Sequence, residues 1–162
     1  MTRKKKRTDI FSAEKRSEIM RAVKSKDTKP EVALRKALFA KGFRYLLNVK
    51  DLPGKPDVVF PKYRAVLFVH GCFWHGHDCP RGARRPQTNP EYWRSKIARN
   101  RKRDHNAVAA LQRRGWSVKI SWECDLKHLP EEANKIAGWL VRRKTRERKI
   151  DPRYQDRPQR KK

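Results

Sequence analysis

The sequence lacks several features, and each absence narrows what the protein can be. Among its 162 residues, no apolar run approaches the roughly 20 residues needed to cross a bilayer. The first residues, MTRKKKRTD, lack the apolar segment of a secretory signal. Cysteine occurs only three times, an odd number that does not suit a disulfide framework. We therefore expect a cytoplasmic protein with no membrane partner.

Acidic residues are also scarce, because 17 aspartates and glutamates stand against 44 lysines and arginines. The formal net charge of +27 exceeds what solubility requires, so we expect a polyanionic partner. A membrane surface would attract the same charge, but no basic amphipathic helix dominates the sequence. Nucleic acid is therefore the favoured partner.

The chain length fits one domain with basic ends. Residues 1–11 read as a basic arm with nothing to pack, residues 12–141 hold the apolar positions, and residues 142–162 are again basic. We predict one folded, monomeric domain between two solvated arms.

Helix signals occur at four places. Thr28 is a capping residue, with Pro30 in the first turn, Glu31 three positions after the cap, and Gly42 as the end. A helix is also predicted after Ser12, a long one from residue 90 to about 115, and a last one over residues 131–140. The earliest of these would carry three apolar residues, Ile19, Met20 and Val23.

Four segments have β character, namely residues 44–47, 57–60, 65–70 and 116–122. Asp57 therefore stands at the start of one strand, and His70 at the end of the next. The order of elements predicts an α/β fold in which helices flank a central mixed sheet.

All three cysteines fall into one pattern with a histidine, Cys72-x4-His77-x-Cys79 followed by Cys124 after the last predicted strand. Three thiolates and one imidazole in fourfold coordination suit Zn²⁺, and four protein ligands leave no open position for water. The pattern predicts a structural zinc site. The alternative is that the cysteines are small buried apolar residues and the histidine lies at the surface.

Three carboxylates could serve a second, oxygen-ligated metal such as Mg²⁺. Asp57 follows a proline at a strand start, Glu31 lies in the first turn of a helix, and Asp104 interrupts the apolar stripe of the long helix. That stripe is otherwise apolar: Trp93, Ile97, Val108 and Leu111. Each acid has another explanation, since Glu31 could complete a capping box, Asp57 could belong to a turn, and Asp104 could pair with a neighbouring arginine.

The stretch HGCFWHGHDC also holds two histidines that the zinc pattern does not use, His70 and His75. An imidazole titrates near neutral pH and therefore suits proton transfer. Phe73 and Trp74 lie between zinc ligands, and Trp93 begins the long helix. Aromatic rings among lysines and arginines can stack on bases or wedge between them, although core packing is the alternative.

Six segments together resemble the very short patch repair (Vsr) endonucleases. They occur in the order of that family and cover residues 19 to 124: IMRAVKSKDT, PEVALRKAL, LPGKPDVVF, VLFVHGCFWHGHDC, EYWRSKIARNRKRD and GWSVKISWEC. The HGCFWH core with its following His-x-Cys is highly specific. The resemblance implies a restriction-endonuclease-like fold of the PD-(D/E)xK type. It also implies a magnesium-dependent nick 5′ to the thymine of a T:G mismatch, which arises by deamination of 5-methylcytosine.

The resemblance also implies roles for individual residues. Asp57 would be the main magnesium ligand with the backbone carbonyl of Val69, His75 would be the general base, and His70 would assist at the scissile phosphate. Glu31 and Asp104 would orient waters and the catalytic histidine. Zinc would be held by Cys72, His77, Cys79 and Cys124. The DNA-binding wedge would consist of Phe73, Trp74 and Trp93 from the major groove and Met20 from the opposite groove.

The chain departs from the family pattern in three places, one of which is its two arms, longer and more basic than the family requires. Val69 replaces a threonine, and Gly76 and Asp78 replace two histidines that flank a zinc ligand. The implied setting is the nucleoid of a bacterial cytoplasm, with possible contacts to other mismatch repair proteins. Two alternatives stay open: a restriction-type or general DNA endonuclease on the same fold, and a noncatalytic basic zinc module that binds DNA or RNA.

Overall fold

The computed structural model describes residues 15, 18, 27–84, 86–87 and 89–144. Its main elements are α2 (Lys29–Ala40), β1 (Val58–Phe60), β2 (Ala65–His70), α3 (Pro90–Arg113), β3 (Ser117–Trp122) and α4 (Leu129–Lys144). Short 3-10 helices span Pro61–Tyr63 and Asp125–His128. Within the described residues, no helix is long and apolar enough to cross a membrane.

Several predictions concern residues outside this described part. They are the arm at residues 1–11 and the helix after Ser12 with Ile19, Met20 and Val23. The C-terminal tail lies outside it except for its first residues, because α4 continues past residue 141 to Lys144. The domain boundaries therefore stay predictions.

The sheet is small and mixed, with the strand order β1-β2-β3. β1 and β2 are antiparallel with Val58 opposite Leu67, whereas β2 and β3 are parallel with Ala65 opposite Ser117. A central mixed sheet is thus confirmed. The strand predicted over residues 44–47 is wrong, because only Leu46 forms an isolated bridge, to Val59. The left-handed conformation of Asn48 (φ 55°) turns the chain before a longer pairing can form.

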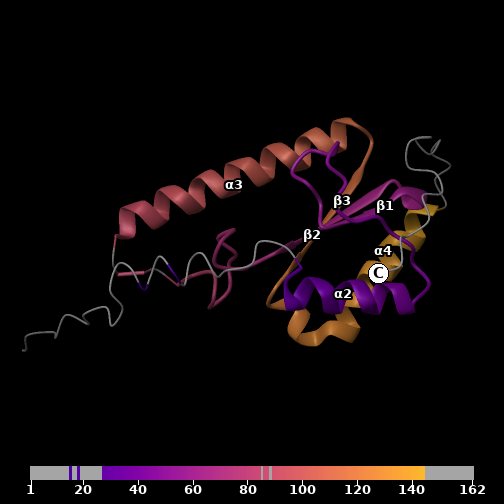
Figure 1. Ribbon diagram of the computed structural model, residues 1–162, viewed down its shortest axis with the longest axis horizontal. Coiled ribbons are helices and arrows are strands. Elements are labelled where there is room, and N and C mark those ends of the chain that lie inside the picture. The colour runs from indigo at the N-terminus through magenta and orange to yellow at the C-terminus, as the bar shows by residue number, and fades with distance from the viewer. Residues whose placement is uncertain (1–14, 16–17, 19–26, 85, 88, 145–162) are drawn as a thin grey trace, which may run out of the picture.

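The sheet lies between two helical layers, with α3 along one side and α2 with α4 along the other (Figure 1). Successive side chains of a strand point to opposite faces, so the central strand β2 serves both layers. Leu67 packs with the α2 and α4 side chains, while Val66 and Phe68 pack toward Leu111 of α3. Burial on both faces explains why β2 is a continuous apolar run rather than an alternating one.

Helix α2 begins as its sequence predicts. The Glu31 N–H donates to the Thr28 hydroxyl oxygen at 3.5 Å, and that hydroxyl donates to the Glu31 carboxylate at 2.7 Å. The apolar face of α2 buries Leu34 and Leu38 completely. The cap therefore fixes the helix start and holds the buried Glu31 carboxylate at that end of the sheet.

Helix α3 is longer than the sheet it covers, and its N-terminal half continues past the sheet (Figure 1). This half runs beside the chain that follows β2. The Asn100 side-chain amide donates to the Trp74 carbonyl oxygen at 2.9 Å, and the Ile97 methyl approaches the backbone of Gly76. Helix α3 thus joins the sheet to the segment that carries the candidate site.

Candidate functional site

The parallel pairing of β2 and β3 brings the predicted zinc ligands together. His70 lies opposite Trp122 at the end of the ladder, and the Glu123 N–H continues the ladder by donating to the His70 carbonyl oxygen at 2.9 Å. Cys72 and Cys124 each follow two residues later, at the same edge of the sheet. His77 and Cys79 complete the cluster, and the four ligand atoms all lie within 4.8 Å of one another.

The loop between these ligands is held by close backbone contacts. The His77 N–H donates to the Cys72 carbonyl oxygen at 2.9 Å, and the Ala83 N–H donates to the Cys79 carbonyl oxygen at 2.8 Å. Gly82 packs so tightly that a Cβ there would lie 1.9 Å from the His77 carbonyl oxygen. The loop therefore admits only glycine at this position.

The electrostatics of the cluster call for a cation. Burial raises the pKa of Cys72 to about 12 and also raises that of Cys124, while the Gly82 N–H is the main cause that lowers the pKa of Cys79 to about 6. Three thiols this close could not all ionise without a compensating positive charge. The donor set and spacing fit a tetrahedral metal ion, which needs deprotonated thiols as ligands. The predicted ligands are therefore brought together.

A second cluster joins His70, His75 and Asp104. The two imidazole rings stack with centroids 3.8 Å apart and planes 9° apart, and His75 Nδ1 lies 2.5 Å from an Asp104 carboxylate oxygen. An ionised carboxylate only accepts, so Nδ1–H donates to Asp104, and in the neutral form of the ring Nε2 of His75 is then the acceptor. Burial, and next the charge of His75, lower the pKa of His70 to about 4, so His70 is neutral at pH 7.

Asp104 is thus explained on the apolar stripe of α3, because it orients an imidazole. The neighbouring Arg103 also approaches its other oxygen, at 3.8 Å, in agreement with the predicted arginine pair. The nitrogen and oxygen atoms of this cluster lie within 4.8 Å of one another. The hydrogen bond between His75 and Asp104 and the stacking of the two rings hold this set together.

The carboxylates of Asp57 and Glu31 form the third part of the site. Asp57 immediately precedes β1, and its carboxylate accepts the Val69 N–H at 2.7 Å, one residue before His70. Burial is the main cause that raises the pKa of Asp57 to about 6, and the negative charge of Glu31 adds to it. A half-buried carboxylate beside a second acid is a site where a divalent cation would relieve repulsion.

Sequence reasoning did not identify Arg35, which is buried on α2 and donates to Asp27 at 2.6 Å. Its positive charge partly offsets the pKa rise of Asp57. The sequence spacing could have indicated Arg35 as a site residue. It lies four positions after Glu31 and therefore on the same face of the helix.

The rings of Phe73, Trp74 and Trp93 contact one another beside these clusters. Their centroids lie 5.2 to 5.9 Å apart, and all three side chains are half-buried. They belong to neither hydrophobic core cluster of the described residues, so core packing does not explain them. Met20, the fourth predicted wedge residue, lies outside the described residues.

The tight approach at Gly82 generates a stability prediction. Gly82→Ala should lower the free energy of unfolding by more than about 3 kcal/mol and reduce bound metal, because its methyl group collides with the His77 backbone. Thermal unfolding and metal content by mass spectrometry measure the two effects. Gly138→Ala is the control, since a Cβ there meets only the Arg142 side chain at 3.4 Å. Equal metal content in both variants would contradict the prediction.

The chain is similar in sequence to known nicking enzymes and to one family profile. Residues 8–81 match the sequence profile of the DNA mismatch endonuclease Vsr family. The type II nicking enzyme V.XorIIP of Xanthomonas oryzae is 51% identical over 122 residues, which cover 75% of this chain and 89% of that protein. The type II nicking enzyme V.NmeAIP of Neisseria meningitidis is 49% identical over 121 residues, which cover 75% of this chain and 86% of that protein.

A third relative carries the family's own name. The DNA mismatch endonuclease Vsr of Escherichia coli is 41% identical over 137 residues, which cover 82% of this chain and 87% of that protein. The predicted resemblance is therefore confirmed over most of the chain. On this evidence, the protein belongs to the Vsr family of DNA mismatch endonucleases.

Proposed function

We propose that this protein nicks double-stranded DNA on the 5′ side of a thymine mispaired with guanine, where 5-methylcytosine has been deaminated. The observation that carries the proposal is the placement of a base and a wedge on one loop. His75, held by Asp104, follows directly after the contacting rings of Phe73 and Trp74. A loop built this way would bring a proton acceptor to the phosphate next to a base step that the rings open.

The metal cluster would hold structural zinc through Cys72, His77, Cys79 and Cys124. All four ligands come from the protein, so the ion would have no open position for water. Its role would be to join the ends of β2 and β3, where His77 also stacks on Trp122 with ring centroids 4.2 Å apart. The loop would then present His75 and the rings without rearrangement, which is the condition for efficient positioning.

Asp57 would hold magnesium, together with the backbone carbonyl of Val69, and Glu31 would orient the bound waters. When bound, magnesium would stabilise the charge that develops on the phosphate. Asp57 fits this role because the Val69 N–H holds its carboxylate next to the residue whose carbonyl would be the second ligand. We also propose a restriction-endonuclease-like fold. The supporting feature is that the Asp57 carboxylate lies at the start of β1, the first strand of the antiparallel pair β1 and β2.

In the hydrolytic step, Nε2 of His75 would take the proton of the attacking water. The water oxygen would bond to phosphorus, and the bond between phosphorus and the 3′ oxygen of the preceding nucleotide would break. A proton from a second water would convert that oxygen to a hydroxyl, which leaves a nick with a 3′-hydroxyl and a 5′-phosphate for repair synthesis. Asp104 would stabilise the imidazolium formed on His75, because it already accepts the Nδ1–H. His70, neutral and stacked on His75, would assist at the scissile phosphate.

Selectivity would come from the weakness of a mismatched step. A mispaired base costs less to unstack than a paired one, so rings that enter the stack favour the mismatch. Phe73, Trp74 and Trp93 would enter from the major groove and Met20 from the opposite groove. We further propose that the protein acts as a monomer in the bacterial nucleoid and contacts other mismatch repair proteins.

Asp57→Asn should reduce nicking of a T:G duplex by more than about 10³-fold, because the neutral amide holds magnesium poorly. The assay is denaturing electrophoresis of a labelled duplex incubated with magnesium. Asp51→Asn, at an exposed position six residues earlier, is the matched control and should retain activity.

The same assay separates the alternatives. A wild-type protein that cuts T:G and T:A duplexes equally is a general endonuclease. One that binds both duplexes but cuts neither with magnesium is a noncatalytic binding module, and either result would refute the proposed function.

His75→Ala should lower the single-turnover rate by about 10²- to 10⁴-fold, the usual contribution of a general base. Asp104→Asn should lower it less, because an amide can still accept the Nδ1–H but does not stabilise an imidazolium. His105→Ala changes an exposed histidine next to Asp104 and should leave the rate unchanged. A His75→Ala rate within twofold of wild type would exclude His75 as the base.

Phe73→Ala should reduce the preference for T:G over T:A by about tenfold, because a stacking ring contributes about 1–3 kcal/mol per base. The measurement is the ratio of nicking rates on the two duplexes. Phe39→Ala removes a ring that is 44% exposed on α2 and should leave this ratio intact. An unchanged ratio in Phe73→Ala would remove this ring from the wedge.

A further inference from the structure

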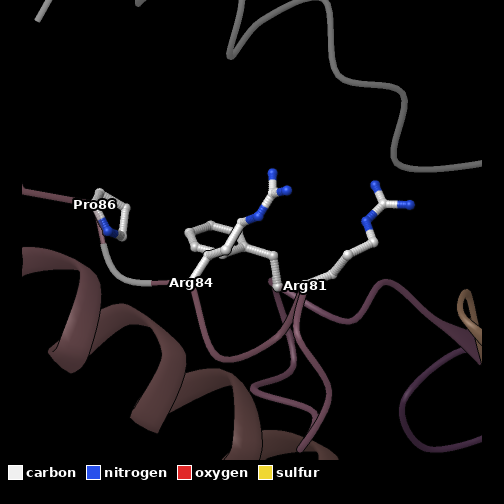
Figure 2. A pocket seen from close by; sticks show the side chains of 4 residues that line it. Arg81, Arg84 and Pro86 are labelled. Carbon is white, nitrogen blue, oxygen red and sulfur yellow. The ribbon is translucent and has the colours of Figure 1, made fainter.

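Beside the ring cluster lies an open hollow of about 460 Å³, lined by Phe73, Arg81, Arg84 and Pro86. Figure 2 shows the guanidinium groups of Arg81 and Arg84 extending to the same side of the loop, and Phe73 lines the same hollow. Arg81 and Arg84 are exposed and lie just after the zinc ligand Cys79. Neither arginine has a role in the function proposed so far.

The charge of this hollow is positive, with one acid beside it. A guanidinium nitrogen of Arg81 lies 3.0 Å from a Glu123 carboxylate oxygen, and the Arg81 side chain is still 51% exposed. A guanidinium has five N–H donors in a planar fork, so one ion pair leaves donors for a second anion. Glu123 directly precedes the zinc ligand Cys124, so the ion pair also ties Arg81 to the end of β3.

We propose that Arg81 and Arg84 form a phosphate-binding subsite for the DNA strand next to the wedge, which rests on the proposed function. An arginine fork matches phosphate geometry better than a point charge does. Two arginines that line one hollow can contact one phosphate or two adjacent phosphates of the same strand. Because Phe73 lines the same hollow, these phosphates flank the base step that the ring enters.

The subsite would hold the DNA strand in place while the ring of Phe73 enters the base stack. A ring that unstacks a base step pushes the strand away from the protein, and a grip on the adjacent phosphates holds that strand in place. Phosphate contacts fix position and carry no sequence information themselves. The two arginines therefore act as positioning residues. They raise the affinity for matched and mismatched DNA by the same factor.

The test measures binding to T:G and T:A duplexes without magnesium, from 50 to 200 mM salt. In Arg84→Ala and in the Arg81→Ala, Arg84→Ala double variant, affinity should fall by the same factor for both duplexes. The slope of log K against log salt should become shallower by about 0.9 for each phosphate that the variant no longer neutralises. Arg84→Lys should restore much of the slope because it keeps the charge.

The control is the Lys41→Ala, Arg113→Ala double variant, which removes two exposed positive charges outside the hollow. Ethylation of single phosphates locates the subsite on the DNA: wild-type binding should be sensitive at phosphates beside the mismatch, and the arginine variants should be insensitive there. A slope change no larger than in the control, or a change in sensitivity only at phosphates far from the mismatch, would overturn the subsite. Thermal unfolding and metal content confirm that the Arg81 variant is folded.

The test of the phosphate subsite can fail independently of the test of the proposed function. Failure of the wild-type protein to nick the T:G duplex with magnesium would refute the proposed function. An unchanged salt slope in Arg84→Ala would refute the phosphate subsite while nicking persists.

Discussion

The parallel pairing between β2 and β3 is the constraint on which the rest of the site depends. It sets His70 opposite Trp122 and so brings Cys72 and Cys124 to one edge of the sheet. A metal at that edge would close the loop between them, and the loop carries His75 and the rings. Without this register, the candidate metal ligands, the imidazole pair and the aromatic cluster would lie on separate, unsupported segments.

Negative charge is scarce in this chain, and three of its carboxylates are held in place at the candidate site. Asp104 accepts from His75, Asp57 accepts from the backbone of β2, and Glu31 completes the cap of α2 beside Asp57. Burial and the neighbouring Glu31 raise the pKa of Asp57, and a nearby cation would favour its ionised form. A strongly basic exterior would attract DNA, while these few acids would serve the proposed chemistry.

Much of this arrangement could be predicted from the sequence. Local signals were sufficient for α2, because the capping box at Thr28 and Glu31 acts within one turn. Spacing was sufficient to predict that three cysteines and a histidine come together as one cluster. The absent strand at residues 44–47 could not be foreseen, since it depends on the backbone conformation of Asn48 and on pairing across the sheet. The Asp104 partner and the buried Arg35 likewise depend on tertiary contacts.

The length of α3 has a mechanical consequence. Trp93 and Asp104 are eleven positions apart, so they lie close to three helical turns apart, on one face and separated by about 16 Å along the axis. A continuous helix between them resists bending and keeps the distance between the two residues fixed. In the proposed mechanism, the gap between the opened base step and the attacked phosphate would then be set by a rigid rod rather than by a hinged loop.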